Sequence, residues 1–299
     1  MTVQVRPTAP TINLISFGFV YYLLYLVPKN WLSRFVGWSV RCRWPFGLAQ
    51  YIRDSFIKHF KVDVSESEFP LENYPTLGEF FIRRLRSGAR PLGTSALISP
   101  VDGMLTQRGG FTSGSESSLT QIKGIQYSLK KLIGEGWDAS PYAGGSFLTI
   151  YLAPWNYHRI HSPISGRVLR VRHIAGALWP VNRWSVENIS ELFVRNDRIL
   201  VEMEGDGGRV LAVMVGATNV GRITVPFCPQ FIGNSMGVTG IRDWSPSNEL
   251  NLAKGDDLGC FEMGSTVVLV LDALWTSLLK NELKGDAPLP MKVGTDLSA

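Results

Sequence analysis

The sequence predicts an α+β protein in which a helical N-terminal region, residues 1–90, precedes a mainly antiparallel β-rich body, residues 91–299. Helical spacing of apolar residues occurs mostly in the first region. From about residue 95, short apolar runs instead recur between Gly, Pro, Asn and Asp, which is typical of strands joined by turns. The composition agrees, since 45% hydrophobic and 18% charged residues with 30 Gly and 17 Pro suit a folded, loop-rich chain.

The N-terminal region also carries the basic charge of the chain. Residues 1–61 have a net charge of +7, whereas the rest of the chain carries −2. An uncharged stretch runs from Pro7 to Pro28, and tryptophans then alternate with Lys and Arg up to Trp44. Aromatic rings and cations are both favoured at a membrane interface. We therefore expect residues 12–44 to associate with a membrane surface.

Other interpretations of this segment are a single membrane span or a buried helix of a soluble core. The uncharged stretch is barely long enough to cross a bilayer, which takes about 20 residues. Nucleic acid is not expected as a partner, because here the cations accompany a long apolar run.

Three further helices are predicted. Apolar residues recur at helical spacing over residues 46–60. The stretch FFIRRLRSGARPL, residues 80–92, predicts a helix that ends near Gly88. Residues 123–135 predict the one clear helical interruption of the β-rich body.

Five apolar runs predict strands of the body, because each is rich in β-branched and aliphatic residues and is bounded by turn residues. They are residues 146–152, 166–174, 197–203, 209–217 and 265–271.

Two of the four histidines, His158 and His161, fall in one motif, WNYHRIHSPISG. The prolines and glycine around them predict a loop or strand end, where functional residues concentrate. Imidazole titrates near neutrality, so the pair suits acid–base chemistry, with a purely structural loop as the alternative. A zinc site would need further ligands, and the three cysteines have no matching spacing, so no metal is expected. His173, at a strand end, is not expected to be catalytic.

Asp102, in the stretch SPVDGML, is a carboxylate that could complete an activating set with a histidine. Asp-Gly after Pro is ordinarily a turn. Asp102 would have a catalytic role if the fold brings it beside a histidine. There its carboxylate would orient the ring and stabilise imidazolium. The glycines of VGATNVGRI, residues 215–223, lack G-x-G-x-x-G spacing, which excludes a dinucleotide site.

The step Gly264-Ser265 stands at the start of the last apolar run. A turn before a strand is the simplest interpretation. A chemical interpretation also exists, because glycine has no side chain to obstruct attack by the Ser265 hydroxyl on the carbonyl carbon of Gly264. That attack forms an ester, elimination leaves dehydroalanine, and hydrolysis with loss of ammonia gives a pyruvoyl group at a new N-terminus.

Nine pieces of the chain, taken in order, resemble the bacterial phosphatidylserine decarboxylases over nearly the whole length. They are VPKNWLSRFVGW, FKVD, FFIRRLRSGARP, SPVDG, KGIQYSL, YLAPWNYHRIHSPISG, LFVRNDR, VGATNVG and KGDDLGCFEMGST. The Y-H-R-x-H element and the final G-S-T are the most specific. Three mild departures from the common pattern are Asn156, Asp197 and Met263.

The resemblance implies self-cleavage between Gly264 and Ser265. The products would be a β subunit, residues 1–264, and an α subunit, residues 265–299, whose N-terminal pyruvoyl group comes from Ser265.

It also implies roles for three other residues. Asp102, His161 and Ser265 would form the self-processing triad, with His161 as the base and Asp102 orienting it. His158 would assist decarboxylation and return a proton to the substrate carbon.

The implied activity is decarboxylation of phosphatidylserine to phosphatidylethanolamine and CO2, with the pyruvoyl group as cofactor. The enzyme would act in phospholipid biosynthesis on the cytoplasmic side of the cell membrane, as a peripheral or monotopic protein. We expect a homodimer of αβ units.

Three other functions stay open at this point. One is a pyruvoyl-dependent decarboxylase of a soluble amino acid, against which the aromatic, basic N-terminal region argues. Another is a serine hydrolase that uses Asp102, His161 and Ser265 without self-cleavage. The third is a non-catalytic membrane-bound β module in which Gly264-Ser265 is only a turn.

Overall fold

The computed structural model describes residues 28–111, 118–120, 126–218, 222–262, 266–285 and 287–299. In these ranges the α-helices are α2 (Lys29–Ser39), α3 (Leu48–Phe60), α4 (Leu77–Phe81), α5 (Leu129–Ile133), α6 (Arg183–Asn188), α7 (Leu192–Arg195) and α8 (Ala273–Leu278). Short 3₁₀ turns are η1 (Leu71–Asn73), η3 (Ser140–Tyr142) and η4 (Asn281–Lys284). The strands are β1 (Gly103–Gly110), β2 (Ser118–Thr120), β3 (Gln126–Ser128), β4 (Ser146–Tyr151), β5 (Arg159–His161), β6 (Gly166–Ile174), β7 (Arg198–Gly205), β8 (Gly208–Val215), β9 (Ile223–Thr224), β10 (Ile241–Trp244), β11 (Asn251–Leu252), β12 (Asp257–Phe261), β13 (Thr266–Leu271) and β14 (Leu289–Met291).

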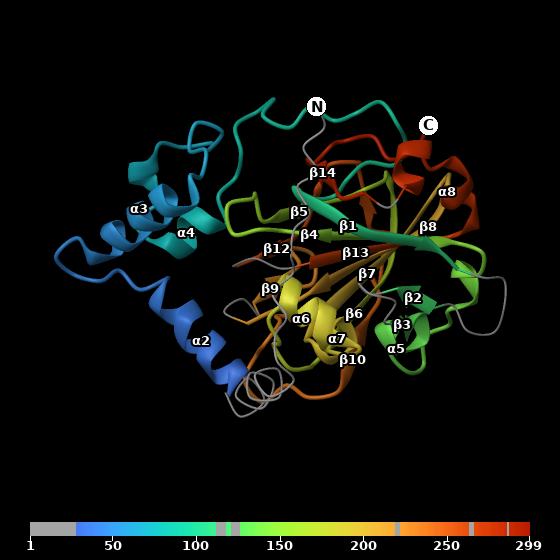
Figure 1. Cartoon of the computed structure of the whole chain (residues 1–299), viewed down its shortest axis with the longest axis horizontal. Helices are drawn as coiled ribbons and strands as arrows, with labels where there is room; N and C mark the ends of the chain where they lie inside the picture. The colour runs from blue at the N-terminus through green and yellow to red at the C-terminus, as the bar shows by residue number, and fades with distance from the viewer. Residues whose placement is uncertain (1–27, 112–117, 121–125, 219–221, 263–265, 286) are drawn as a thin grey trace, which may run out of the picture.

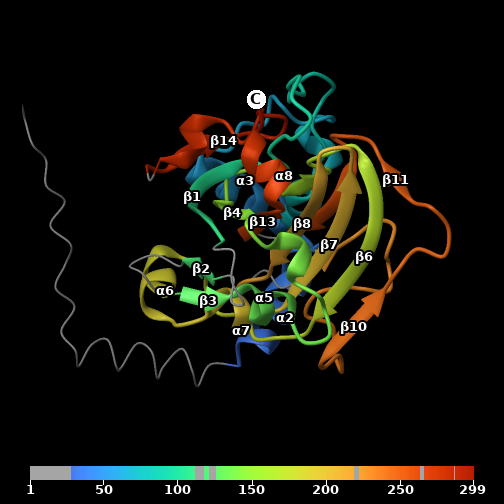
Figure 2. The same ribbon diagram turned by 90° about the vertical axis from the view of Figure 1, so that its right-hand side faces the viewer.

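A nine-stranded antiparallel sheet forms the centre of the described chain. Its order is β10-β6-β7-β8-β13-β4-β1-β14, and β11 also pairs with β6. Figure 2 shows the sheet curving through β6, β7 and β8, with β10 and β11 beside β6. A smaller sheet has the order β5-β12-β9, and β2 pairs with β3. The predicted α+β class and the mainly antiparallel sheet are therefore confirmed.

The middle of the large sheet is buried on both faces. On β13, Val267 and Leu269 contact one core, to which the small sheet contributes Ile160 and Phe261. Val268 contacts the other core, which α5, α6 and α7 cover. A strand covered on both faces needs a continuous apolar run rather than alternation. This explains the sequence TVVLVL, in which every residue of β13 is buried.

The N-terminal helices α2, α3 and α4 lie together at one side of the sheets (Figure 1). Val62, Tyr74 and Phe80 form a small core of their own, against which α3 packs. Helix α2 connects to α4 through a hydrogen bond that the Gly78 amide donates to the Val40 carbonyl, at 2.9 Å.

The prediction of a helix that ends near Gly88 is wrong, because α4 ends at Phe81. The next residues pair with an earlier segment instead. The Glu68 amide donates to the Arg84 carbonyl, and the Arg86 amide donates to the Glu66 carbonyl, both at 2.9 Å. In these hydrogen bonds the Arg84 carbonyl and the Arg86 amide pair with a distant segment, so they are not available for helical hydrogen bonds. The helix predicted over residues 123–135 is shorter than expected. Helix α5 covers only residues 129–133 and follows strand β3.

None of the helices in the described part of the chain combines the length and apolar character needed to span a bilayer. Most of the uncharged stretch predicted at a membrane, residues 7–27, lies outside the described residues.

Replacing a central side chain of β13 tests the burial of this sheet. We expect Leu269→Ala to destabilise the protein by about 2–5 kcal/mol, because it removes methyl groups from a core residue with no exposed surface. Leu278→Ala, on the solvent-facing side of α8, is the matched control and should change stability by no more than about 0.5 kcal/mol. Urea denaturation measures both, and equal losses would contradict the assigned burial.

Candidate active site

Four neighbouring strands have their ends side by side at one end of the large sheet. Met104 near the start of β1 pairs with Tyr151 at the end of β4. Tyr151 pairs with Thr266 at the start of β13, which in turn pairs with Val215 at the end of β8. Antiparallel pairing thus gathers SPVDG, the histidine motif, the start of VGATNVG and the residue after Ser265 at the same place.

Of the connections that cross between the large and small sheets at this end of the large sheet, two carry the histidine motif and the Gly264-Ser265 step. One connection, residues 152–158, leads from β4 to β5, and the other, residues 262–265, leads from β12 to β13. Strand β4 pairs with β13, and β5 pairs with β12, so the two connections begin and end beside each other. The Phe261 amide donates to the His158 carbonyl at 3.0 Å, which fixes the small-sheet ends together.

The step Gly264-Ser265 itself lies outside the described residues, as does Met263. The flanking residues are described. Glu262 is paired with arginines next to the small sheet, and Thr266 is buried in the large sheet. The segment between them is therefore bounded by two anchored residues.

His158 is fully buried at this crossing. Its ring contacts Phe81 of α4, with centroids 4.1 Å apart. Its Nδ1 lies 2.8 Å from the carbonyl oxygen of Asn156. A carbonyl only accepts hydrogen bonds, so Nδ1 carries the hydrogen and Nε2 presents a lone pair. That Nε2 is buried and has no hydrogen-bond partner among the described residues.

The surroundings keep His158 neutral. Burial lowers the pKa of His158 to about 3, outweighing its hydrogen bond to Asn156, and the nearby Arg83 guanidinium lowers it further. An unpaired acceptor in an apolar pocket is costly for a structural residue, because its desolvation is not compensated. Such an atom is expected where a ligand or reacting group supplies the missing proton.

His161 lies on β5 and has partners at both ring nitrogens. Nδ1 donates to the Gly255 carbonyl at 2.7 Å, and the Tyr157 hydroxyl donates to Nε2 at 3.0 Å. Burial lowers the pKa of His161, while the bond to Gly255 and the charges of Asp257 and Asp102 oppose that change. The imidazole is thus held as a neutral base whose Nε2 faces a hydroxyl.

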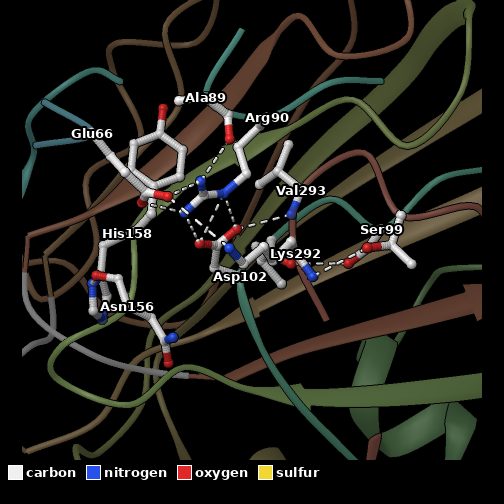
Figure 3. Close-up of polar contacts among 12 residues, drawn as sticks. Glu66, Ala89, Arg90, Ser99, Asp102, Asn156, His158, Lys292 and Val293 are labelled. Atoms are coloured by element: carbon white, nitrogen blue, oxygen red, sulfur yellow. Dashed lines mark hydrogen bonds and ion pairs between the residues drawn. The ribbon is translucent and has the colours of Figure 1, made fainter. Parts of the chain in front are cut away.

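Asp102 is held by Arg90 rather than by a histidine (Figure 3). The Arg90 Nε donates to Oδ1 at 3.0 Å, a terminal nitrogen donates to Oδ2 at 2.6 Å, and the Val293 amide donates to Oδ1 at 2.9 Å. The other side of the guanidinium binds Glu66, with two bonds of 2.8 Å. Arg90 therefore forms a two-sided bidentate bridge between carboxylates, the geometry to which its planar fork is suited.

The predicted contact between Asp102 and His161 is not made directly in this state. The two segments are nevertheless adjacent, because the His161 amide donates to the Pro100 carbonyl at 2.9 Å. Sequence reasoning did not single out Arg90, Tyr157 or Phe81. Tyr157 had a local signal, an aromatic hydroxyl inside the histidine motif, whereas Phe81 and Arg90 act on residues distant in the chain.

A mainly apolar cavity of about 530 Å³ lies at this end of the sheet. Its lining includes Met104, Tyr151, Val181, Val186, Phe193 and Thr266. Apolar walls beside the reacting edge suit a substrate with an apolar portion. No group of three or more His, Cys, Asp or Glu in the described residues is placed to hold a metal ion.

The family model described as phosphatidylserine decarboxylase matches residues 77–295, and a second, described as PSD, matches residues 20–61. A phosphatidylserine decarboxylase proenzyme of Anaeromyxobacter sp. (strain K) is 40% identical over 251 residues, covering 83% of this chain and 88% of the relative. One from Myxococcus xanthus (strain DK1622) is 37% identical over 265 residues, covering 87% and 92%. A third, from Brevibacillus brevis, is 37% identical over 260 residues, covering 84% and 88%.

The fold, the histidine pair and these matches define an enzyme of phospholipid metabolism. The chain belongs to the phosphatidylserine decarboxylase family. The resemblance that the sequence motifs indicated is therefore confirmed.

The neutral state of His158 can be tested by nuclear magnetic resonance on histidine-labelled protein. We expect its Nε2 signal to keep the unprotonated shift from pH 8 to about pH 5, because its pKa is held near 3. Phe81→Ala admits water to the ring and should raise that pKa toward about 6.5. An ordinary titration of His158 in the unaltered protein would contradict the assigned burial.

The same pKa shift acts on stability. The unfolded chain binds a proton at this residue below about pH 6.5, whereas the folded chain does not until about pH 3. This histidine therefore contributes a loss of stability as the pH falls through that window. His158→Gln should reduce the loss, and urea titrations at pH 7 and pH 5 measure the difference.

Proposed function

We propose that this enzyme decarboxylates phosphatidylserine to phosphatidylethanolamine and CO2, using a pyruvoyl group that it makes from Ser265 by cleaving its own chain after Gly264. The observation that carries the proposal is the buried, unpaired Nε2 of His158 beside the connection that contains this step. Membership of the family supports the reaction, and the word proenzyme in the names of the relatives supports the processing.

His161 is proposed as the base for self-cleavage. Its neutral imidazole can accept the Ser265 hydroxyl proton at Nε2 once the Tyr157 hydroxyl turns away. Asp102 favours the imidazolium that then forms, by its charge, and Arg90 holds that carboxylate in place.

The surroundings fit a pyruvoyl group at position 265. The buried Nε2 of His158 has no hydrogen-bond partner among the described residues, and a substrate bound to that group would supply one. When formed, that group supplies an electron sink for the pair left by CO2. The lone pair at Nε2 of His158 accepts a hydrogen bond from the substrate amino group, through which a proton can be relayed. An imidazolium in this apolar pocket is a strong acid, so it readily returns the proton to the carbon that lost CO2.

Helix α2 supports the peripheral membrane binding that is part of this proposal, whereas the cytoplasmic side of the cell membrane rests on the family resemblance. Trp31, Phe35 and Trp38 occupy one face, at spacings of four and three, and each is at least half exposed. Phe46 and Tyr51 add exposed aromatic surface at the start of α3. A soluble amino acid would need no such surface. Pairing of αβ units as a homodimer rests on the family resemblance alone and stays a prediction.

Three variants separate the two reactions. Ser265→Ala and His161→Ala should remain as one uncleaved, inactive chain, because each removes a group that the first step needs. His158→Ala should cleave normally but decarboxylate at least a hundredfold more slowly, which is the usual contribution of a proton donor. Denaturing gels follow cleavage, and CO2 release follows activity. Normal activity from an intact Ser265→Ala chain would contradict the proposal.

Membrane binding can be tested with vesicles of phosphatidylserine and phosphatidylcholine. We expect the double change Trp31→Ser and Trp38→Ser to lower the bound fraction several-fold, because interfacial rings are lost. Leu274→Ser, an equally exposed position on α8, is the control and should bind normally. Added salt should also weaken binding, owing to the basic excess of residues 1–61. Equal losses in both variants would exclude α2 as the docking face.

A further inference from the structure

A second cavity, of about 250 Å³, is lined by Glu262, the first residue of the connection 262–265, which contains the Gly264-Ser265 step (the cleavage connection). Its lining residues come mainly from α2, from the turn that follows this helix and from residues 233–236. Gly78 of α4, Arg222 and Glu262 complete it. Glu262 directly precedes the undescribed segment 263–265, whereas Thr266, directly after it, lines the apolar cavity. The two residues that flank segment 263–265 therefore line different cavities, and the one lined by Glu262 is the more polar.

Helix α2 contributes Arg34 and Gly37 to this cavity, and Arg41 lines it from the turn that follows the helix. The aromatic residues Trp31 and Trp38 of the same helix are exposed. The helix proposed to rest on the membrane thus presents Arg34 to this cavity, and the turn after the helix presents Arg41.

The cavity carries an excess of positive charge. Three guanidiniums, of Arg34, Arg41 and Arg222, face one carboxylate, Glu262. Glu262 forms ion pairs with Arg41 and Arg222 at its two oxygens. Arg34 donates its Nε to the Asn234 carbonyl at 3.0 Å, and an ion pair for its guanidinium is not found among the described residues. An arginine has several N–H donors, so each still has some to offer.

The three arginines differ in how firmly the structure fixes them. A Cβ at Gly78 would lie 2.7 Å from Cγ of Arg41, so this side chain is held against α4. The Arg41 and Arg222 side chains are equally exposed, at 43% each, and no carboxylate partner of Arg34 is found among the described residues. Planar guanidiniums recognise phosphate oxygens in pairs, which makes a phosphate the ligand that fits this lining best.

The position of the cavity fits the phosphate of a phospholipid rather than a distant regulatory anion. Ser265 is three residues from Glu262, and three residues span at most about 10–11 Å. In phosphatidylserine the phosphate and the amino-acid portion are separated by only a few bonds. A phosphate held here would direct the serine moiety toward His158 and the cleavage connection.

We propose that this cavity binds the phosphodiester group of the phospholipid substrate, with Arg34 and Arg222 as its contacting residues. The inference rests on the proposed function, of which it names the headgroup subsite. Glu262 keeps Arg41 and Arg222 oriented when the site is empty, and the phosphate takes over part of that pairing on binding.

Calorimetry with glycerophosphoserine, the water-soluble headgroup, tests the site on the purified full chain. We expect Arg34→Gln and Arg222→Gln each to weaken binding about tenfold or more, as for the loss of a charged hydrogen bond. Arg43→Gln removes the same charge from an exposed ion pair with Glu79 outside the cavity, and should bind like the unaltered protein. Arg34→Lys keeps the charge and should retain part of the affinity.

Inorganic phosphate distinguishes the source of the ligand. It should bind at least tenfold more weakly than glycerophosphoserine, since it lacks the serine moiety. Equal affinity would assign the cavity to free phosphate and overturn the inference, as would undetectable binding of glycerophosphoserine to the unaltered protein.

Kinetics in mixed micelles separate this inference from the proposed function. Arg34→Gln and Arg222→Gln should raise the KM for phosphatidylserine about tenfold, with kcat and release of residues 265–299 nearly unchanged. If both variants bind and react like the unaltered protein, the headgroup site is wrong while decarboxylation stands. If the unaltered protein binds glycerophosphoserine through Arg34 and Arg222 but releases no CO2, the anion site stands and the proposed function fails.

Discussion

The joint pairing of two successive strand pairs, β4–β5 and β12–β13, is the constraint on which the rest of this molecule depends. Strands β4 and β13 pair in the large sheet, and β5 and β12 pair in the small one, so the links between them start and finish beside each other. One link carries His158 and the other carries the Gly264-Ser265 step. Strand β13 is buried on both faces and paired on both sides, so the residue after the step cannot shift without breaking the central sheet. The fold thus holds a reactive segment between two fixed ends.

The same arrangement explains how the two fragments would stay associated after cleavage of the chain before Ser265. The segment from residue 266 onward supplies β13 to the middle of the large sheet and β14 to its edge, and Leu297 is fully buried in the same core. Loss of one peptide bond before β13 would leave these contacts intact. The N-terminal helices add a further link, because Phe81 of α4 covers His158 and α2 connects to α4 at Gly78. The helix proposed to dock on the membrane and the histidine pocket are therefore linked through α4.

Much of this could be predicted from the sequence, because the decisive patterns are local. The apolar run of β13 indicated a strand, and the prolines and glycine of the histidine motif indicated a loop or strand end. The helix predicted to end near Gly88 failed because residues 84 and 86 pair with residues 66 and 68, and no local pattern encodes that pairing. Arg90 was missed for a similar reason, since its role comes from Glu66 and Asp102, 24 and 12 residues away. The neutral state of His158 depends on burial under Phe81, which composition alone cannot reveal.

The intact mass of the purified protein tests the central claim most directly. The account predicts two polypeptides, one of them a 35-residue fragment that begins at residue 265. That fragment should be lighter than its serine-terminated form by one ammonia, which identifies the pyruvoyl group. A single uncut chain that decarboxylates phosphatidylserine would contradict the account.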